Sequence, residues 1–136
     1  MKDFEYNLRF LIGQQMQSLS GLLGAKYHEL PTSDRFPSLY RRYELNGVEY
    51  DATLEACVEP VCKDWGRFSY GITTTDGSDA DDSSLPTELQ EVCKGFEDKR
   101  TNRWYFYKYE VMPSIVQSYL HFVEQIESIS NIKIIN

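Results

Sequence analysis

Apolar and polar residues alternate with a period of two along the middle of the chain. Six apolar residues occupy every second position from residue 48 to residue 58, and most positions between them are acidic. Asn46-Gly47 comes directly before this run, and this dipeptide favours a type I′ turn between two antiparallel strands. The pattern therefore predicts a hairpin of residues 40–45 and 48–58 with one buried face. In this register three pairs lie opposite each other: Leu45 and Val48, Tyr43 and Tyr50, and Arg42 and Asp51.

Three other segments carry apolar residues at steps of three and four, which is typical of amphipathic helices. The first covers residues 4–25. The second opens at Pro86-Thr87, where Thr87 and Gln90 match the spacing of a capping box. The third begins at Pro113. The residues expected to be buried in the last two helices are Leu89, Val92, Cys93, Phe96, Ile115, Val116, Tyr119, Leu120, Val123 and Ile126.

Two further segments indicate strands. Residues 67–75 are β-branched and aromatic, and residues 103–111 form the most aromatic stretch of the chain. Because both faces of the latter are apolar, we expect a central strand that is covered on both sides. Residues 132–135 can add a short edge strand. The sequence thus predicts a single α+β domain over residues 1–136, in which an N-terminal helix, a middle helix and a long C-terminal helix pack on an antiparallel sheet.

Composition limits the classes of protein to which the chain can belong. It has 136 residues, of which 41% are hydrophobic, so there is enough apolar material for a core and wholesale disorder is excluded. No apolar run approaches the ~18 residues that a membrane-spanning helix needs. The 21 acidic residues outnumber the 14 basic ones and give a net charge of −7, which disfavours binding to nucleic-acid phosphates. We therefore expect neither a membrane nor a nucleic acid as the partner.

The sequence shows no targeting signal. Asp3 and Glu5 stand where a signal peptide would carry positive charge. The cysteines are odd in number, Cys57, Cys62 and Cys93, which favours reduced thiols over a set of disulfides. These features predict a cytoplasmic protein.

The motifs that usually mark catalysis or metal binding are missing. Cys57 and Cys62 are five positions apart, and His28 and His121 are far from each other in the chain, so no zinc-binding spacing occurs. Neither histidine is paired with a nucleophile. The aspartate-rich residues 76–84 lack the glycine and glutamate positions of an EF-hand, so we expect an exposed, mobile loop and leave cation binding open. We expect no cofactor and no enzymatic activity.

The negative charge is concentrated in the middle of the chain. Residues 44–91 hold twelve acidic and two basic residues, a net charge of −10, and the rest of the chain carries +3. Four carboxylates fall on the outward face of the second predicted strand, with only Arg42 near them, and four more fall in the aspartate-rich loop. Like charges at every second strand position repel each other, so this row costs stability and indicates a surface for a cationic partner. The expected partner-binding residues are Glu49, Asp51, Glu55, Glu59, Asp76, Asp79, Asp81 and Asp82.

Small acidic proteins with such a surface typically neutralise a basic partner, as bacterial immunity proteins do with nuclease toxins. By this analogy of size, charge and architecture, we predict an inhibitor or immunity-type (antitoxin) protein that occludes a basic toxin or effector domain. Two alternatives stay open: an acidic dimeric secretion chaperone that holds an effector segment, and a small enzyme with a carboxylate pair such as Glu49 with Glu110 or Asp64. An acidic face that only solubilises the protein would give the same pattern. The sequence does not predict the oligomeric state.

Overall fold

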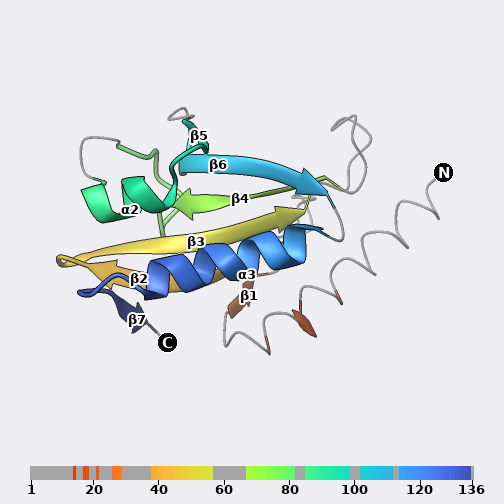
Figure 1. The fold of residues 1–136 in the computed structure, drawn as a ribbon, viewed down its shortest axis with the longest axis horizontal. Coiled ribbons are helices and arrows are strands. Elements are labelled where there is room, and N and C mark those ends of the chain that lie inside the picture. The colour runs from red at the N-terminus through yellow and green to blue at the C-terminus, as the bar shows by residue number, and fades with distance from the viewer. Residues whose placement is uncertain are drawn as a thin grey trace.

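The protein is described from a computed structural model, which covers residues 14, 17–18, 21, 26–28, 38–56, 67–81, 85–98, 102–111 and 114–135. These residues form a seven-stranded antiparallel sheet in the order β1-β2-β3-β4-β6-β5, with β7 also paired to β2 (Figure 1). Two helices, α2 (Thr87–Val92) and α3 (Ser114–Glu127), complete the described elements. The strands are β1 (Lys26–His28), β2 (Ser38–Leu45), β3 (Val48–Ala56), β4 (Arg67–Thr73), β5 (Glu97–Asp98), β6 (Trp104–Val111) and β7 (Lys133–Ile135). The predicted α+β class with an antiparallel sheet is confirmed.

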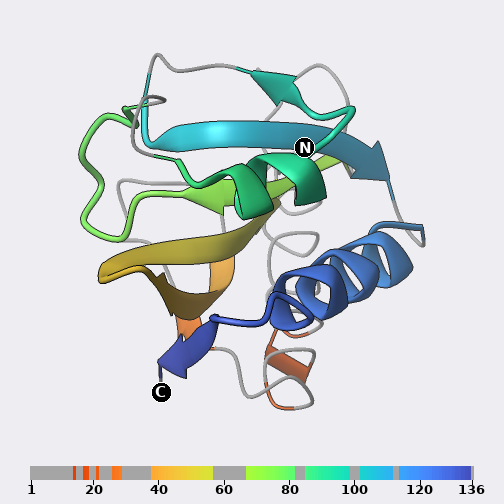
Figure 2. The ribbon, with the colours of Figure 1, turned by 60° about the vertical axis from the view of Figure 1, so that its left-hand side comes forward.

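The hydrophobic core lies between one face of the sheet and the two helices (Figure 2). The Phe122 ring of α3 lies 5.6 Å from the Tyr70 ring of β4 and 5.3 Å from the Phe96 ring, which follows α2. The buried Tyr119 hydroxyl donates a hydrogen bond of 2.7 Å to the Ala52 carbonyl oxygen of β3. The buried residues of α3 are Ile115, Tyr119, Phe122, Val123 and Ile126, which agrees with the predicted spacing.

The helices differ in detail from the prediction. The predicted N-terminal helix over residues 4–25 lies largely outside the described residues, so the three-helix arrangement stays a prediction. With 14 residues, α3 has an ordinary length and is not the long helix that was expected. The capping box is wrong: Pro86 is the N-cap residue, and the Gln90 side-chain amide instead donates to the Leu85 carbonyl oxygen at 2.8 Å. No helix in the described ranges is both long and apolar enough to cross a membrane.

The hairpin of β2 and β3 forms in the predicted register. Leu45 pairs with Val48, Tyr43 with Tyr50 and Arg42 with Asp51. Asn46 and Gly47 adopt φ angles of 55° and 82°, the positive values that a type I′ turn requires. Val48 was expected to be buried, but it is 46% exposed because it lies beside the turn, and the buried part of β3 begins at Tyr50. Val58 lies outside the described residues.

Strand β3 is an interior strand, and this overturns one expectation about its polar face. It pairs with β2 on one side and β4 on the other, and every residue from position 50 to position 54 is buried. Asp51 and Thr53 were expected to point to solvent, yet they are 5% and 2% exposed. The hydroxyl oxygens of Thr53 and Thr73 lie 2.8 Å apart, within hydrogen-bonding distance. The second face of the sheet is therefore a covered polar layer over this part of β3.

Strand β6 was expected to be central and covered on both sides. It lies between β4 and β5, but β5 pairs only with Phe106 and Tyr107. Its first half agrees with the prediction, because Trp104 and Tyr105 are buried, whereas its last residue, Val111, is 53% exposed. The expectation is wrong for the second half because the short partner strand leaves it at the edge of the described sheet.

A register shift shapes the start of β6. Ile72 pairs with Phe106 but Thr73 pairs with Trp104, so Tyr105 is an extra residue in the strand. Tyr105 packs edge-on against Tyr50, with ring centroids 5.8 Å apart, in the core. Trp104 consequently faces the other side of the sheet.

The remaining strands follow local sequence signals to different degrees. The predicted strand over residues 67–75 is β4, and the predicted edge strand over residues 132–135 is β7, which pairs with β2. Strands β1 and β5 were not predicted because three and two residues carry no measurable periodicity.

Gly71 lies where the backbones of β4 and β6 approach each other closely. A Cβ atom at this position would clash with the Phe106 carbonyl oxygen and lie 2.9 Å from the Tyr107 Cα atom. Both neighbours are backbone atoms, so they cannot rotate away. We expect Gly71→Ala to lower the free energy of unfolding by about 2–4 kcal/mol, measured by urea denaturation. Gly21→Ala is the control, because its Cβ would meet nothing within 4 Å; equal stability of the two variants would contradict this packing.

Candidate functional site

The sheet face without α2 and α3, called here the second face, carries most of the polar strand residues. Alternation along the paired strands places on it the side chains of Tyr40, Arg42, Glu49, Asp51, Thr53, Glu55, Ser69, Tyr107 and Tyr109. Only three of these nine are acidic, and two of those three, Asp51 and Glu55, form an ion pair with an arginine. The second face is therefore a mixed polar and aromatic surface, not the row of carboxylates that the sequence suggested.

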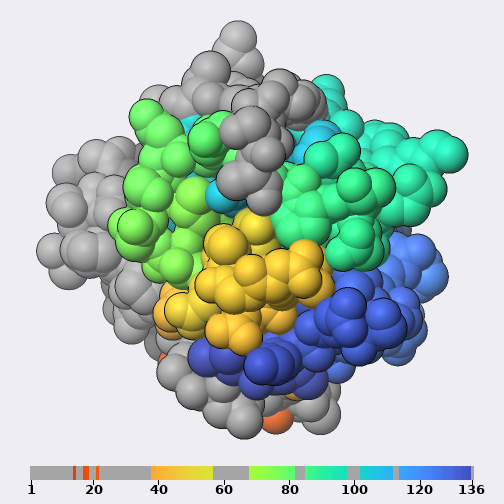
Figure 3. Space-filling model, turned by 90° about the vertical axis from the view of Figure 1, so that its left-hand side faces the viewer, coloured from red at the N-terminus to blue at the C-terminus, as the bar shows by residue number. Residues whose placement is uncertain are grey.

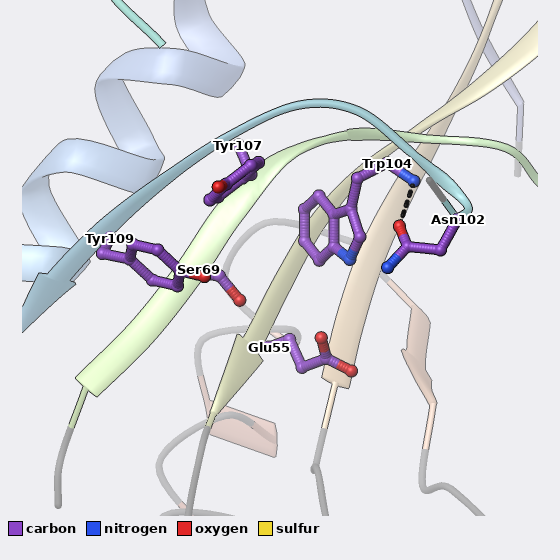
Figure 4. A pocket seen from close by; sticks show the side chains of 6 residues that line it. All are labelled: Glu55, Ser69, Asn102, Trp104, Tyr107 and Tyr109. Atoms are coloured by element: carbon purple, nitrogen blue, oxygen red, sulfur yellow. Dashed lines mark hydrogen bonds between the residues drawn. The ribbon is translucent and has the colours of Figure 1, made fainter. Parts of the chain in front are cut away.

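A pocket of about 130 Å³ opens on the second face (Figure 4). It is lined by Glu55 of β3, Ser69 of β4, Asn102 before β6, and Trp104, Tyr107 and Tyr109 of β6. The Asn102 side-chain oxygen accepts a hydrogen bond of 3.0 Å from the Trp104 backbone N–H, which fixes the bend that leads into β6. In Figure 4 the Glu55 carboxylate lies on one side of the hollow, with the Tyr107 and Tyr109 rings across from it. The pocket thus combines three aromatic rings with carboxylate, amide and hydroxyl groups.

The charge of Glu55 is neutralised by Arg103, a pairing that the sequence did not predict. The Arg103 guanidinium donates to Glu55 Oε1 at 2.9 Å, and the same oxygen accepts a longer bond of 3.4 Å from the Ser38 hydroxyl. The guanidinium carbon also lies 5.6 Å from the centroid of the Trp104 ring. Arg103 thus holds Glu55 and Trp104 together at the edge of the pocket.

Asp51 was expected to face a partner, but it is a structural residue. Arg42 binds it through two hydrogen bonds, from Nε to Oδ1 at 2.8 Å and from Nη2 to Oδ2 at 3.1 Å. Burial raises the pKa of Asp51, and the hydrogen bond from Arg42 partly opposes this shift. The predicted pairing of these two residues is correct, but their place on an interior strand removes Asp51 from the accessible surface.

The aspartate-rich loop is anchored next to the pocket. The Thr74 N–H donates to the Arg103 carbonyl oxygen and the Ala80 N–H to the Asn102 carbonyl oxygen, both at 2.9 Å. Ala80 is buried by this contact. The loop was expected to be exposed and mobile over residues 76–84; residues 76–81 are described, and the backbone bonds at Thr74 and Ala80 hold this part beside the segment that leads into the pocket. Figure 3 shows residues 67–81, in light green, beside β3, in yellow.

Within the loop, the acidic side chains remain at the surface. Asp76, Asp79 and Asp81 are exposed. Asp76 Oδ1 accepts hydrogen bonds from the Ser78 N–H at 3.0 Å and the Ser78 hydroxyl at 2.6 Å, and these bonds lower the pKa of Asp76. Asp76 therefore stays ionised at neutral pH and the turn is locally stabilised.

The predicted binding residues thus fall into different environments. Glu49 is exposed and lies at the same end of the sheet as the loop, because Asp51 pairs with Thr73 and Arg42 donates to the Thr75 carbonyl oxygen at 3.4 Å. Glu55 lies in the pocket, and Asp51 is buried. Glu59 and Asp82 lie outside the described residues.

The described residues offer little for catalysis or metal binding. They contain no group of three or more His, Cys, Asp or Glu side chains that could hold a metal ion. Burial raises the pKa of the Cys93 thiol to about 12, so it stays protonated at neutral pH. Glu110 of β6 pairs with Phe68 of β4, which in turn pairs with Ala56 of β3. Ala56 is seven residues from Glu49, roughly 23 Å along β3 at about 3.3 Å per residue. The carboxylates of Glu49 and Glu110 therefore do not form a pair. Asp64 lies outside the described residues.

Sequence reasoning missed the pocket, although one signal pointed to it. The alternate positions Tyr107 and Tyr109 share a face, but their run was interpreted as core because both faces of the segment are apolar. The pairing of Arg103 with Glu55 has no local signal, because 48 positions separate them. Comparison with protein-family models, curated proteins and solved structures found no match for the chain. Its function is therefore inferred from the pocket and the loop beside it.

Removing Arg42 from its ion pair with Asp51 should make the stability of the protein depend on pH. Without its cation, the buried Asp51 carboxylate is destabilising at pH 7, and we expect a loss of about 1–3 kcal/mol in the free energy of unfolding. A carboxyl group whose pKa is raised in the folded state binds protons more tightly there, so stability falls as the pH rises from the unfolded towards the folded pKa. The loss caused by Arg42→Ala should therefore shrink when the pH is lowered from 7 to 4.

Urea denaturation of both proteins at several pH values measures this difference. Lys133→Ala is the control, because its ion pair with Glu44 is longer, 3.6 Å, and its side chain is 74% exposed; we expect a change below about 0.5 kcal/mol. The double variant Arg42→Ala/Asp51→Asn should lose the pH dependence that the single variant shows. A loss of the same size at pH 7 and pH 4 would contradict the burial of an ionised Asp51.

Proposed function

We propose that this protein is a binding protein of the inhibitor or immunity type, which occludes a basic protein partner without catalysing a reaction. The observation that carries this proposal is the position of the exposed aspartates. Asp76, Asp79 and Asp81 lie in a loop whose backbone is bonded to Asn102 and Arg103, directly beside the aromatic pocket. A negative field and a set of aromatic contact residues are thus combined on neighbouring parts of one surface.

The loop can attract and orient a cationic surface. Clustered charges of one sign raise association rates by about 10–10³, and salt screens this effect. Glu49 adds a further exposed carboxylate at the same end of the sheet. A nuclease domain binds the phosphates of its substrate through lysine and arginine, so an acidic surface that covers this groove blocks the substrate. A basic nuclease toxin is therefore the class of partner that we propose.

The pocket supplies side chains that are common in binding sites. Tyr and Trp carry much of the energy of protein interfaces, while Ser and Asn provide adaptable hydrogen bonds. Tyr109 is 41% exposed, and its ring packs edge-on against Tyr107 with centroids 5.1 Å apart. The pair gives a rigid aromatic contact area that loses little side-chain entropy on binding. Occlusion needs nothing more than this surface.

Neutralising the loop tests the proposal. We expect the triple variant Asp76→Asn/Asp79→Asn/Asp81→Asn to bind the purified basic partner at least tenfold more weakly at 50 mM salt, because asparagine keeps the size of the side chain and removes its charge. The difference should shrink at 500 mM salt. Isothermal titration calorimetry measures both affinities. The control variant Glu88→Gln/Glu91→Gln/Glu124→Gln removes three exposed charges from α2 and α3 and should bind like the wild type.

The partner is obtained by affinity capture from the source cells and purified, and its cleavage of DNA and RNA is then followed with and without the protein. Full inhibition in a one-to-one complex supports the proposal. Equal loss of affinity in the two triple variants, or full cleavage activity in the complex, would overturn it. A stable dimer that binds its partner independently of salt would instead support the chaperone alternative.

A further inference from the structure

Strand β6 leaves part of its outer edge open among the described residues. Strand β5 pairs with Phe106 and Tyr107 only, so no described strand lies beside residues 108–111 on that side (Figure 1). An open edge presents backbone N–H and C=O groups that can pair with another extended strand. Tyr109 and Val111, on the second face of this edge, are 41% and 53% exposed. The edge is therefore a candidate surface for strand pairing.

Two residues of opposite charge lie on the other face of this edge. Lys108 pairs with the core residue Tyr70. Glu110 pairs with the core residue Phe68, so both charged side chains lie on the face that carries α2 and α3. Lys108 is exposed, whereas Glu110 Oε2 is buried and has no hydrogen-bond partner among the described residues. A carboxylate in this position is stabilised by a cation that is brought close to it.

The charges select one register for a second copy of the strand. When two identical antiparallel strands pair about a two-fold axis, side chains opposite each other point to the same face, so the axis passes through a residue. Only an axis through Tyr109 places Lys108 of each copy opposite Glu110 of the other. An axis through Lys108 or Glu110 instead places two like charges opposite each other, which is destabilising. The edge is thus complementary to itself in one arrangement.

We propose that two copies of this chain associate through β6, with Tyr109 facing Tyr109 and Lys108 facing Glu110 across a two-fold axis. The pairing covers residues 108–110 of each copy, because Glu97 of β5 already pairs with Tyr107. The two second faces then form one surface, with an aromatic pocket on each side of the axis. The inference goes beyond the proposed function and does not depend on it.

The short pairing sets the strength of the dimer. Stable protein complexes bury about 1,200–2,000 Å², and three paired residues in each copy bury less than this. We therefore expect a weak dimer, with a Kd of about 10–1,000 µM. This weakness distinguishes it from the stable dimer of the chaperone alternative. Sedimentation equilibrium from about 5 µM to about 1 mM protein measures the Kd.

Charge reversal tests the register. Lys108→Glu and Glu110→Lys each place like charges across the axis, so we expect each variant to dimerise at least tenfold more weakly than the wild type. An equimolar mixture of the two variants restores both pairs of opposite charge and should associate as the wild type does. The control is Lys133→Glu, which reverses an exposed charge on β7, away from β6, and should leave the Kd unchanged.

Cysteine cross-linking gives a second measurement that does not depend on charge. Side chains directly opposite each other have Cβ atoms about 4.5–5.5 Å apart, so Tyr109→Cys should form a disulfide-linked dimer on mild oxidation. Val111→Cys is the matched control, because in this register its two copies lie four residues apart, about 13 Å at 3.3 Å per residue. The wild type gives the background from the native cysteines. Circular dichroism checks the fold of each variant, and Lys108→Glu and Tyr109→Cys decide the matter if Glu110→Lys does not fold.

A wild-type protein that stays monomeric up to about 1 mM would overturn the inference. Equal cross-linking of Tyr109→Cys and Val111→Cys, or a Kd of Lys108→Glu equal to that of the wild type, would also overturn it. If another protein covers this edge instead, Tyr109→Cys gives no linked dimer and the inference is wrong. None of these outcomes affects the proposed function, which is tested separately by neutralising the loop.

Discussion

The interior position of β3 is the constraint on which the rest of this structure depends. A strand between two others cannot leave its polar side chains in water along its whole length, and a buried polar group is costly unless it finds a partner. Each polar residue in the middle of β3 has one: Asp51 binds Arg42 of β2, Thr53 lies within hydrogen-bonding distance of Thr73 of β4, and Glu55 binds Arg103 before β6. The neighbours of β3 are thereby tied to it on both faces, by the apolar core on one and by polar pairs on the other.

The pocket is a consequence of how β6 adapts to this arrangement. The extra residue Tyr105 turns towards the core, which leaves Trp104 on the second face. Gly71 allows the backbone of β6 to approach β4 more closely than any side chain would permit. Asn102 and Arg103 then lie where the loop after β4 can bond to their carbonyl oxygens. The acidic loop and the aromatic pocket are neighbours because both are attached to one bend.

Local sequence patterns predicted most of the strands and helices, whereas the candidate site is formed by residue pairs that are far apart in the sequence. Asn46-Gly47 and the alternation after it were sufficient for the register of the hairpin, and the spacing of apolar residues was sufficient for the buried side of α3. The same alternation of apolar and polar residues fits two structures: a strand with one solvent-exposed face, and an interior strand whose polar side chains are paired with neighbours. Only the fold distinguishes them, because the partner of Glu55 is 48 residues away. The pocket is beyond local patterns for the same reason, since it combines three strands and a bend.

The concentration of charge along the sequence has a different meaning in the folded protein. The bases that neutralise the acidic residues 44–91 come from outside that segment: Arg42 for Asp51, Arg103 for Glu55 and Lys133 for Glu44. The positive flanks are thus folded onto the negative middle, and a count along the sequence overstates the field that a partner meets. Among the described residues of this segment, the exposed carboxylates are those of Glu49, Asp76, Asp79 and Asp81, together with Glu88 and Glu91 of α2. Under the proposed function, a smaller field next to the aromatic pocket orients the partner more sharply than a uniform acidic face would, because attraction and contact then select the same approach.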